Sequence, residues 1–253
     1  MISISNIHKA YKSTQVLKGV DLGINSGCIQ AILGANGAGK STLIKIAACI
    51  LEADSGELFI DNEKITIDSY SYREKMGYVF EQPMYIDKLT PYEYLYFVGK
   101  MYGIEKQTIG NRVNELLVFF GLHESDCYIE RLSKGMKSKV SLAAALIHNP
   151  KHLILDEPFD GVDFLSVQKT TRLLRSLAEK GCTILITSHQ YDVIADLCDR
   201  FALLKDGKIL FNQTLSDLET AAKEPNGNPI SVKQYIETLM DDNTSSPNEL
   251  SWV

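Results

Sequence analysis

The 253-residue chain has no apolar run that approaches the roughly 18 residues of a membrane-spanning helix. Its first residues show no charged segment followed by an apolar one, so we expect no secretory signal. Its five cysteines form no Cys-x-x-Cys pair, which argues against a cysteine-bound metal and favours a reducing cytosol. A net charge of −6 argues against a broad nucleic-acid-binding surface, so no nucleic-acid partner is expected. Repeats and low-complexity tracts are also lacking, whereas 45% hydrophobic content is enough for a sizeable core.

The most informative segment that is present has the sequence Gly-Ala-Asn-Gly-Ala-Gly-Lys-Ser-Thr. It matches the phosphate-binding loop G-x-x-x-x-G-K-[ST], in which glycines let successive backbone N–H groups point into one concavity. The lysine adds positive charge for the β- and γ-phosphates, and the serine hydroxyl is a ligand for Mg²⁺. The residues expected to bind nucleotide are Gly34, Asn36, Gly37, Gly39, Lys40, Ser41 and Thr42.

The flanking segments support this interpretation. Residues 28–33 just before the loop have the pattern of a buried strand, and residues 41–49 just after it have the pattern of a helix. A helix N-terminus directed at the loop favours bound anions. This strand–loop–helix context is what the motif requires, and a chance glycine-rich turn would not be expected to have it.

Two further segments place polar groups next to regular structure. An apolar strand ends in the adjacent carboxylates Asp156 and Glu157, where the first can support a Mg²⁺ shell and the second can polarise an attacking water. Ser133 and Gly135 lie at the position where a helix is expected to begin. A hydroxyl and an N–H at a helix N-terminus can bind a second phosphate, although the same residues also make an ordinary helix cap.

Two single residues follow predicted strands. Gln82 precedes Pro83 at a place suited to a mobile polar contact. His189 follows the strand at 182–187, at the edge of the sheet where ligands of α/β folds bind. A lone histidine at such a place can equally be structural.

Strand-like and helical patterns change along the chain. Short alternating runs occur in residues 1–61, helical patterns dominate from about 90 to 149, and strands alternate with helices from 152 onward. This order predicts an α/β fold with a mainly parallel core sheet. The expected elements near the end are a hairpin turn at Asp206–Gly207, a linker at 224–229, a last helix at 231–240 and a frayed tail at 241–253.

Together these residues resemble the nucleotide-binding domain of ATP-binding-cassette (ABC) transporters over residues 1–214. The resemblance implies a P-loop NTPase with an N-terminal antiparallel β subdomain, a helical subdomain inserted at about 84–150, and a C-terminal extension at 215–253. It implies that ATP and Mg²⁺ are bound and that ATP is hydrolysed. The implied roles are adenine stacking for Tyr11, Mg²⁺ contact and sensing of the membrane partner for Gln82, catalytic base for Glu157, γ-phosphate contact for His189, and dimer contact for the loop Asp160–Asp163.

One segment departs from the family pattern. The signature usually has the sequence Leu-Ser-Gly-Gly-Gln, whereas this chain has Leu-Ser-Lys-Gly-Met at 132–136. Ser133 and Gly135 are kept, but Met136 cannot make the hydrogen bonds of a glutamine amide. We expect Lys134 to face solvent or the rim of the site. This form is similar to that of bacterial single-cassette exporter ATPases.

The resemblance also implies partners. A second cassette, identical or different, is expected to cover ATP with its signature. Closure of the two cassettes is expected to drive integral membrane permease subunits, which they contact at the inner face of the membrane. In the family the aromatic-rich stretch 85–102 belongs to the subdomain that contacts the membrane subunit, although most of its rings are expected to fill a small core. A soluble ABC-type ATPase of the cluster-assembly kind is the alternative. The transported substrate and its direction are not fixed by the sequence, with export favoured by the resemblance.

Overall fold

A computed structural model describes residues 1–83, 85–123, 126–223 and 228–240 of the chain. The predicted tail at 241–253 and most of the predicted linker at 224–229 lie outside these residues. Within them the structure contains two sheets, one antiparallel and one mainly parallel, as the sequence predicted. Among the described residues no helix is long and apolar enough to cross a membrane.

The antiparallel sheet has the strand order β2-β1-β4-β5. Alternate residues of β1, among them Ile2 and Ile4, are buried, as expected for a sheet with one face on the core. The strands are β1 (Ile2–Tyr11), β2 (Thr14–Ile24), β4 (Ser55–Ile60) and β5 (Glu63–Ile65).

The second sheet has the order β10-β9-β3-β8-β7-β6, and all neighbours except β9 and β10 are parallel. Every residue of β3, β7 and β8 is buried, because helices or the other sheet cover both faces. β9 and β10 meet through Asp206 and Gly207, both at positive φ, which confirms the predicted hairpin turn. The strands are β3 (Ile29–Leu33), β6 (Met76–Val79), β7 (His152–Asp156), β8 (Thr183–Thr187), β9 (Arg200–Lys205) and β10 (Lys208–Thr214).

Alternate residues of the parallel sheet enter two different cores. Ile32 and Leu185 pack with α1 and the antiparallel sheet, so α1 lies between the two sheets. Ala31 and Ile186 pack with the opposite layer of helices, which includes α6 and α7. The helices that follow strands directly or after a short turn are α1 (Lys40–Ala47), α2 (Tyr70–Arg73), α6 (Phe164–Glu179) and α7 (Tyr191–Leu197).

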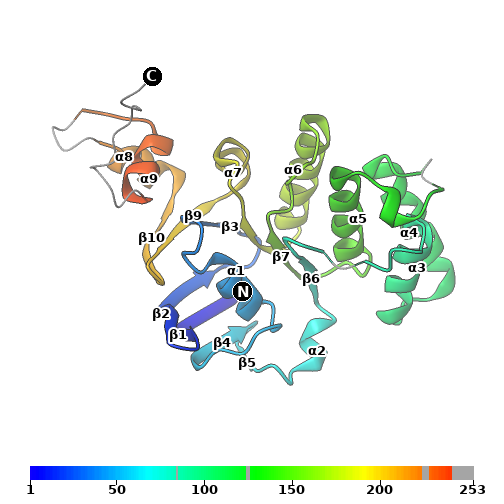
Figure 1. Cartoon of the computed structure of the whole chain (residues 1–253), viewed down its shortest axis with the longest axis horizontal. Coiled ribbons are helices and arrows are strands. Elements are labelled where there is room, and N and C mark those ends of the chain that lie inside the picture. The colour runs from blue at the N-terminus through cyan, green and yellow to red at the C-terminus, as the bar shows by residue number, and fades with distance from the viewer. Residues whose placement is uncertain (84, 124–125, 224–227, 241–253) are drawn as a thin grey trace.

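The two ends of the molecule are helical. α3 and α4 lie at one end, and α8 and α9 lie together beyond β10 at the other (Figure 1). The segment between β6 and β7 forms α3 (Pro91–Met101), α4 (Lys106–Phe120), a 3₁₀ turn η1 (Ile129–Arg131) and α5 (Lys134–Leu146). The C-terminal helices are α8 (Leu215–Ala221), which the sequence analysis missed, and α9 (Val232–Met240).

Candidate active site

The phosphate-binding loop connects β3 to α1 between the two sheets. Gly34 passes so close to β9 that a Cβ at this position would collide with the carbonyl oxygen of Leu204. Gly39 caps α1 at φ 104°, in the left-handed region where other residues are strained. The sequence therefore needs glycine at both positions to bring the loop amides and the start of α1 together.

Lys40 is held by the loop itself. Its Nζ donates to the carbonyl oxygens of Gly34 at 2.7 Å and Ala35 at 3.1 Å, and only 8% of the residue is exposed. Burial lowers the pKa of its ammonium, and the carboxylates of Glu157, Asp156 and Glu81 oppose that shift. The lysine is thus a buried cation that already faces the acidic side of the site.

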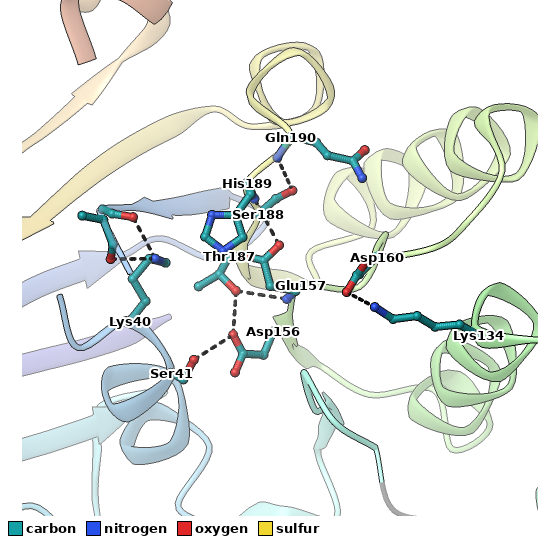
Figure 2. Close-up of polar contacts among 12 residues, drawn as sticks. Lys40, Ser41, Lys134, Asp156, Glu157, Asp160, Thr187, Ser188, His189 and Gln190 are labelled. Carbon is teal, nitrogen blue, oxygen red and sulfur yellow. Dashed lines mark hydrogen bonds and ion pairs between the residues drawn. The ribbon is translucent and has the colours of Figure 1, made fainter. Parts of the chain in front are cut away.

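Asp156 ends β7 beside the first turn of α1. Its Oδ1 accepts a hydrogen bond from the Thr187 hydroxyl at 2.7 Å and lies 3.5 Å from the Ser41 hydroxyl (Figure 2). Its Oδ2 is buried and has no hydrogen-bond partner among the described residues. A buried carboxylate oxygen beside a serine hydroxyl is a suitable oxygen donor set for Mg²⁺.

Glu157 has φ 49°, which is uncommon for a residue other than glycine. Three contacts with two neighbouring residues hold it there. Its N–H donates to the Thr187 hydroxyl at 3.1 Å, its Oε2 accepts from the backbone N–H of His189 at 3.1 Å, and its Oε1 lies 3.2 Å from Nε2 of that histidine. Burial raises the pKa of the Glu157 carboxyl, while His189 and Lys40 act to lower it. A carboxylate of raised pKa next to a phosphate site has the properties of a general base.

These groups surround one hollow of about 570 Å³. It contains one lysine and three carboxylates, so the protein alone is acidic at the place where triphosphate would bind. A divalent cation at Asp156 would offset this charge. The lining residues are Val16, Asn36, Gly37, Gly39, Lys40, Ser41, Thr42, Glu81, Asp156, Glu157 and His189.

Gly34, Gln82 and Tyr11 were also predicted to bind nucleotide but do not line this hollow. Gln82 lines a neighbouring hollow of about 550 Å³ together with Glu157 and Lys134. Tyr11 is 47% exposed and pairs with Thr14 at the end of the β1–β2 hairpin. The structure thus brings together the loop, the two carboxylates and His189 around one hollow, and Gln82 lies in the neighbouring hollow.

The signature residues form a separate surface. Lys134 and Lys40 lie on opposite sides of the two carboxylates (Figure 2). Ser133 caps α5, because its hydroxyl accepts from the N–H of Met136 at 3.2 Å. In this chain by itself it is the ordinary helix cap that the sequence analysis left as an alternative.

The start of α5 is packed against the loop 160–163 of the same chain. A Cβ on Gly135 would collide with the carbonyl oxygen of Gly161. The Nζ of Lys134 lies 2.5 Å from Oδ2 of Asp160, and this pair is exposed to solvent as we expected for the lysine. Asp163 caps α6 and pairs with Lys139 at 2.8 Å, and these hydrogen bonds hold the pKa of its carboxyl below the usual range.

The sequence analysis missed three residues of the site. Thr187 is fully buried and its hydroxyl bridges the Asp156 carboxylate and the backbone N–H of Glu157. The only signal for it in the sequence was its place at the end of a strand. Glu81 lines the hollow next to the predicted Gln82, and Val16 lines it from β2.

A glycine-rich loop that begins a helix, beside two carboxylates at the end of another strand of the same parallel sheet, defines a P-loop nucleoside triphosphatase. Comparison with known proteins narrows the class. The family model described as "ABC transporter" matches residues 17–160. The chain belongs to the ATP-binding proteins of ABC transporters, and it is an ATPase of that family.

Relatives in sequence and in structure agree with this assignment. The chain is 35% identical to the linearmycin resistance ATP-binding protein LnrL of Bacillus subtilis over 86% of its length and 70% of the relative. It is 32% identical to the lantibiotic transport ATP-binding protein SrtF of Streptococcus pyogenes over 84% and 90%. A solved ATP-binding subunit of an ABC transporter superposes with a TM-score of 0.86 at 28% identity, over 95% of this chain and all of the other. The cassette MJ0796, in a dimeric post-hydrolysis state with ADP and Pi, gives 0.78 at 31% identity, over 85% and 99%.

Proposed function

We propose that this chain is the cytoplasmic ATPase subunit of an exporter, bound at the inner face of the membrane to separate permease subunits. Relatives named for linearmycin resistance, lantibiotic transport and bacitracin transport support export. A methionine import ATP-binding protein is also 32% identical to this chain. The direction of transport is therefore tested by measuring accumulation after deletion of the gene. The departure from the usual signature at 132–136 is the sequence feature that favours the exporter group.

The proposed roles follow the geometry of the hollow. Lys40 and the loop amides bind the β- and γ-phosphates, and Ser41 and Asp156 hold Mg²⁺, which neutralises phosphate charge when bound. Glu157 takes the proton of the attacking water, and His189, 3.2 Å from that carboxylate, contacts the γ-phosphate. Gln82 is proposed to reach Mg²⁺ when the site closes, and Tyr11 to stack on adenine.

The active enzyme is proposed to be a dimer in which the signature of one chain covers the ATP of the other. Ser133 and Gly135 do not line the phosphate hollow of their own chain, and this separation supports the arrangement. So does Asp163, which caps α6 on the signature side instead of lining the hollow. ATP would favour the closed dimer only through contacts that the open form lacks.

A dimerisation assay tests this mechanism. Glu157→Gln keeps the shape of the side chain but cannot accept the proton, so ATP should bind without turnover and the closed dimer should accumulate. Size-exclusion chromatography with and without Mg-ATP measures it, with Lys40→Ala in the same background as the control that should stay monomeric. A Glu157→Gln chain that stays monomeric with ATP fully bound would contradict the mechanism.

The membrane partner is proposed to contact the outer side of α3. Tyr92 and Phe97 on α3 and Tyr102 at its C-terminal cap are 41%, 44% and 37% exposed, whereas Tyr85 and Tyr94 pack against the core. Aromatic residues are enriched at protein interfaces, so these exposed rings support a partner surface on α3.

The test of the exporter function is co-purification from the native membrane, with mass spectrometry of the integral protein that accompanies the chain. A Tyr92→Ala/Phe97→Ala variant should lose this protein while its ATP affinity stays unchanged. Deletion of the gene should raise intracellular accumulation of the exported compound class, with antibiotic peptides as the first candidates. A chain that fractionates without any integral protein would favour the soluble ATPase instead.

A further inference from the structure

The last helix of the described chain ends beside the nucleotide site. Met240, the final residue of α9, lines a hollow of about 320 Å³ that adjoins the phosphate hollow. The two hollows share Val16, Asn36 and Gly37. The other residues around the smaller hollow come from β2, from the phosphate-binding loop and from the β9–β10 turn.

Packing fixes the position of α9. Ile236 is 2% exposed, and Tyr235, Leu239 and Met240 pack against the core that contains β9. The Nζ of Lys205, at the end of β9, donates to the carbonyl oxygen of Leu239 at 2.9 Å. The end of α9 is thus anchored where β9 ends.

The same end of β9 supports the phosphate-binding loop. The carbonyl oxygen of Leu204 lies against Gly34, where any side chain would collide with it. Residues 204 and 205 therefore contact the first residue of the loop on one side and the end of α9 on the other. α8 and α9 lie at one end of the molecule (Figure 1). Even so, the last residue of α9, Met240, lines the hollow next to the loop.

We infer that Met240 contacts the base-and-ribose half of the bound nucleotide, so that the C-terminal extension is part of the nucleotide site. The inference rests on the proposed binding of phosphates by Lys40. With the phosphates there, the rest of the nucleotide has to leave the phosphate hollow at its open margin. The smaller hollow begins at that margin and includes Thr14, the residue paired with Tyr11, the proposed adenine platform.

The chemistry of the side chain suits this role. Methionine is apolar, polarisable and flexible, and its thioether packs well against aromatic rings. A contact of this kind strengthens binding of any purine nucleotide but contributes nothing to an inorganic polyphosphate. ATP and GTP should depend on Met240, whereas tripolyphosphate should not.

Methyl NMR of the full chain labelled with [methyl-¹³C]methionine tests the contact directly. The chain has six methionines, and the Met240 resonance is assigned by its absence from the Met240→Ala spectrum. We expect saturating Mg-ATP to shift this resonance through the ring current of the base, and Mg-tripolyphosphate to leave it in place. A Met240 resonance that does not move with ATP, or that moves equally with both ligands, would overturn the inference.

Affinities measured by isothermal titration calorimetry give a second readout. Met240→Ala should weaken ATP and GTP roughly 3- to 10-fold through lost apolar contact. Leu210→Ala, an exposed apolar residue on β10 outside the hollow, is the matched control and should leave both affinities unchanged. Equal affinities for wild type and Met240→Ala would count against the contact. If Lys40→Ala leaves ATP binding intact, the phosphate assignment fails instead, and the two failures are thereby distinguished.

Discussion

Replacement of Thr187 by valine tests whether one buried hydroxyl positions both the Asp156 carboxylate and the backbone of Glu157. The hydroxyl donates to Asp156 at 2.7 Å and accepts from the N–H of Glu157 at 3.1 Å, and the residue is fully buried. Valine has nearly the same shape and removes only the hydrogen bonds. The change leaves the buried Asp156 carboxylate without its closest donor and the half-buried N–H of Glu157 without its acceptor.

The expected loss of stability follows from these two groups. A hydrogen bond to a charged group contributes about 1.5–3 kcal/mol, and an unpaired buried N–H costs about 1–3 kcal/mol. Thr187→Val should therefore lower the free energy of unfolding by about 2.5–6 kcal/mol, a large part of the usual 5–15 kcal/mol. Glu157 at φ 49° also loses one of its supports, so kcat should fall by about tenfold or more, which corresponds to roughly 1.4 kcal/mol of barrier.

Urea unfolding and steady-state ATP hydrolysis measure the two effects. ATP affinity should change little, because Thr187 does not line the phosphate hollow. Thr187→Ser keeps the hydroxyl and is the matched control, which should retain most of the stability and kcat. The reasoning is refuted if the valine variant keeps the wild-type unfolding energy within 0.5 kcal/mol and the wild-type kcat, or if serine is as damaging as valine.

Three further predictions concern other charged groups. Lys40→Ala should weaken ATP binding by about 1.5–3 kcal/mol in calorimetry, because the phosphates lose their nearest cation; an unchanged Kd would contradict this. Lys134→Gly should change kcat only a few-fold, because the lysine is exposed and its pair with Asp160 contributes at most about 1 kcal/mol to stability. A hundredfold loss of kcat would show that the lysine contacts phosphate. Burial lowers the pKa of His148 to about 4, so stability should fall by roughly 3 kcal/mol as pH drops from 6.5 to 4, and His148→Gln should flatten that dependence in urea titrations.

The sign of the His148 effect follows from which state takes up the proton. The unfolded histidine becomes charged near pH 6.5, while the folded one stays neutral down to about pH 4. Protons therefore bind the unfolded chain first, and the folded state loses stability across that interval. The folded histidine is stacked on Tyr102 at 3.7 Å between ring centroids, and its Nε2 lies 3.0 Å from the carbonyl oxygen of Met76.

The fold could be predicted from the sequence where local pattern and chain order agree. The buried runs at 29–33 and 183–187 are apolar on both faces, which indicates a covered parallel sheet, and the structure confirms this. The helix at 215–221 was missed although Thr214 and Asp217 form a capping box, because the segment is short and has only one buried residue. A short helix with little apolar periodicity gives a weak sequence signal.

The site could be predicted only where a motif fixes local geometry. Lys40 and Ser41 follow from the loop pattern because the loop and the helix are contiguous in sequence. The bridge by Thr187 joins residues that are 30 and 31 positions apart, and its existence depends on the register of β7 against β8. The contact of Met240 with the surroundings of the loop joins segments that are far apart in the sequence, and no local pattern encodes it.

The hydrogen bonds of Lys40 set a limit on what nucleotide binding can gain. Without nucleotide its ammonium already donates to two loop carbonyls, at 2.7 and 3.1 Å. Phosphate oxygens must replace at least part of these bonds, so the net contribution of the lysine is smaller than the strength of its phosphate contacts. When phosphate oxygens replace the loop carbonyls, the lysine charge offsets part of the phosphate charge. This matters because three carboxylates already make the hollow acidic. The same argument explains why Mg²⁺ beside Asp156 should matter as much as the lysine. Lys40 can offset only one of these carboxylates, and each bound phosphate adds further negative charge.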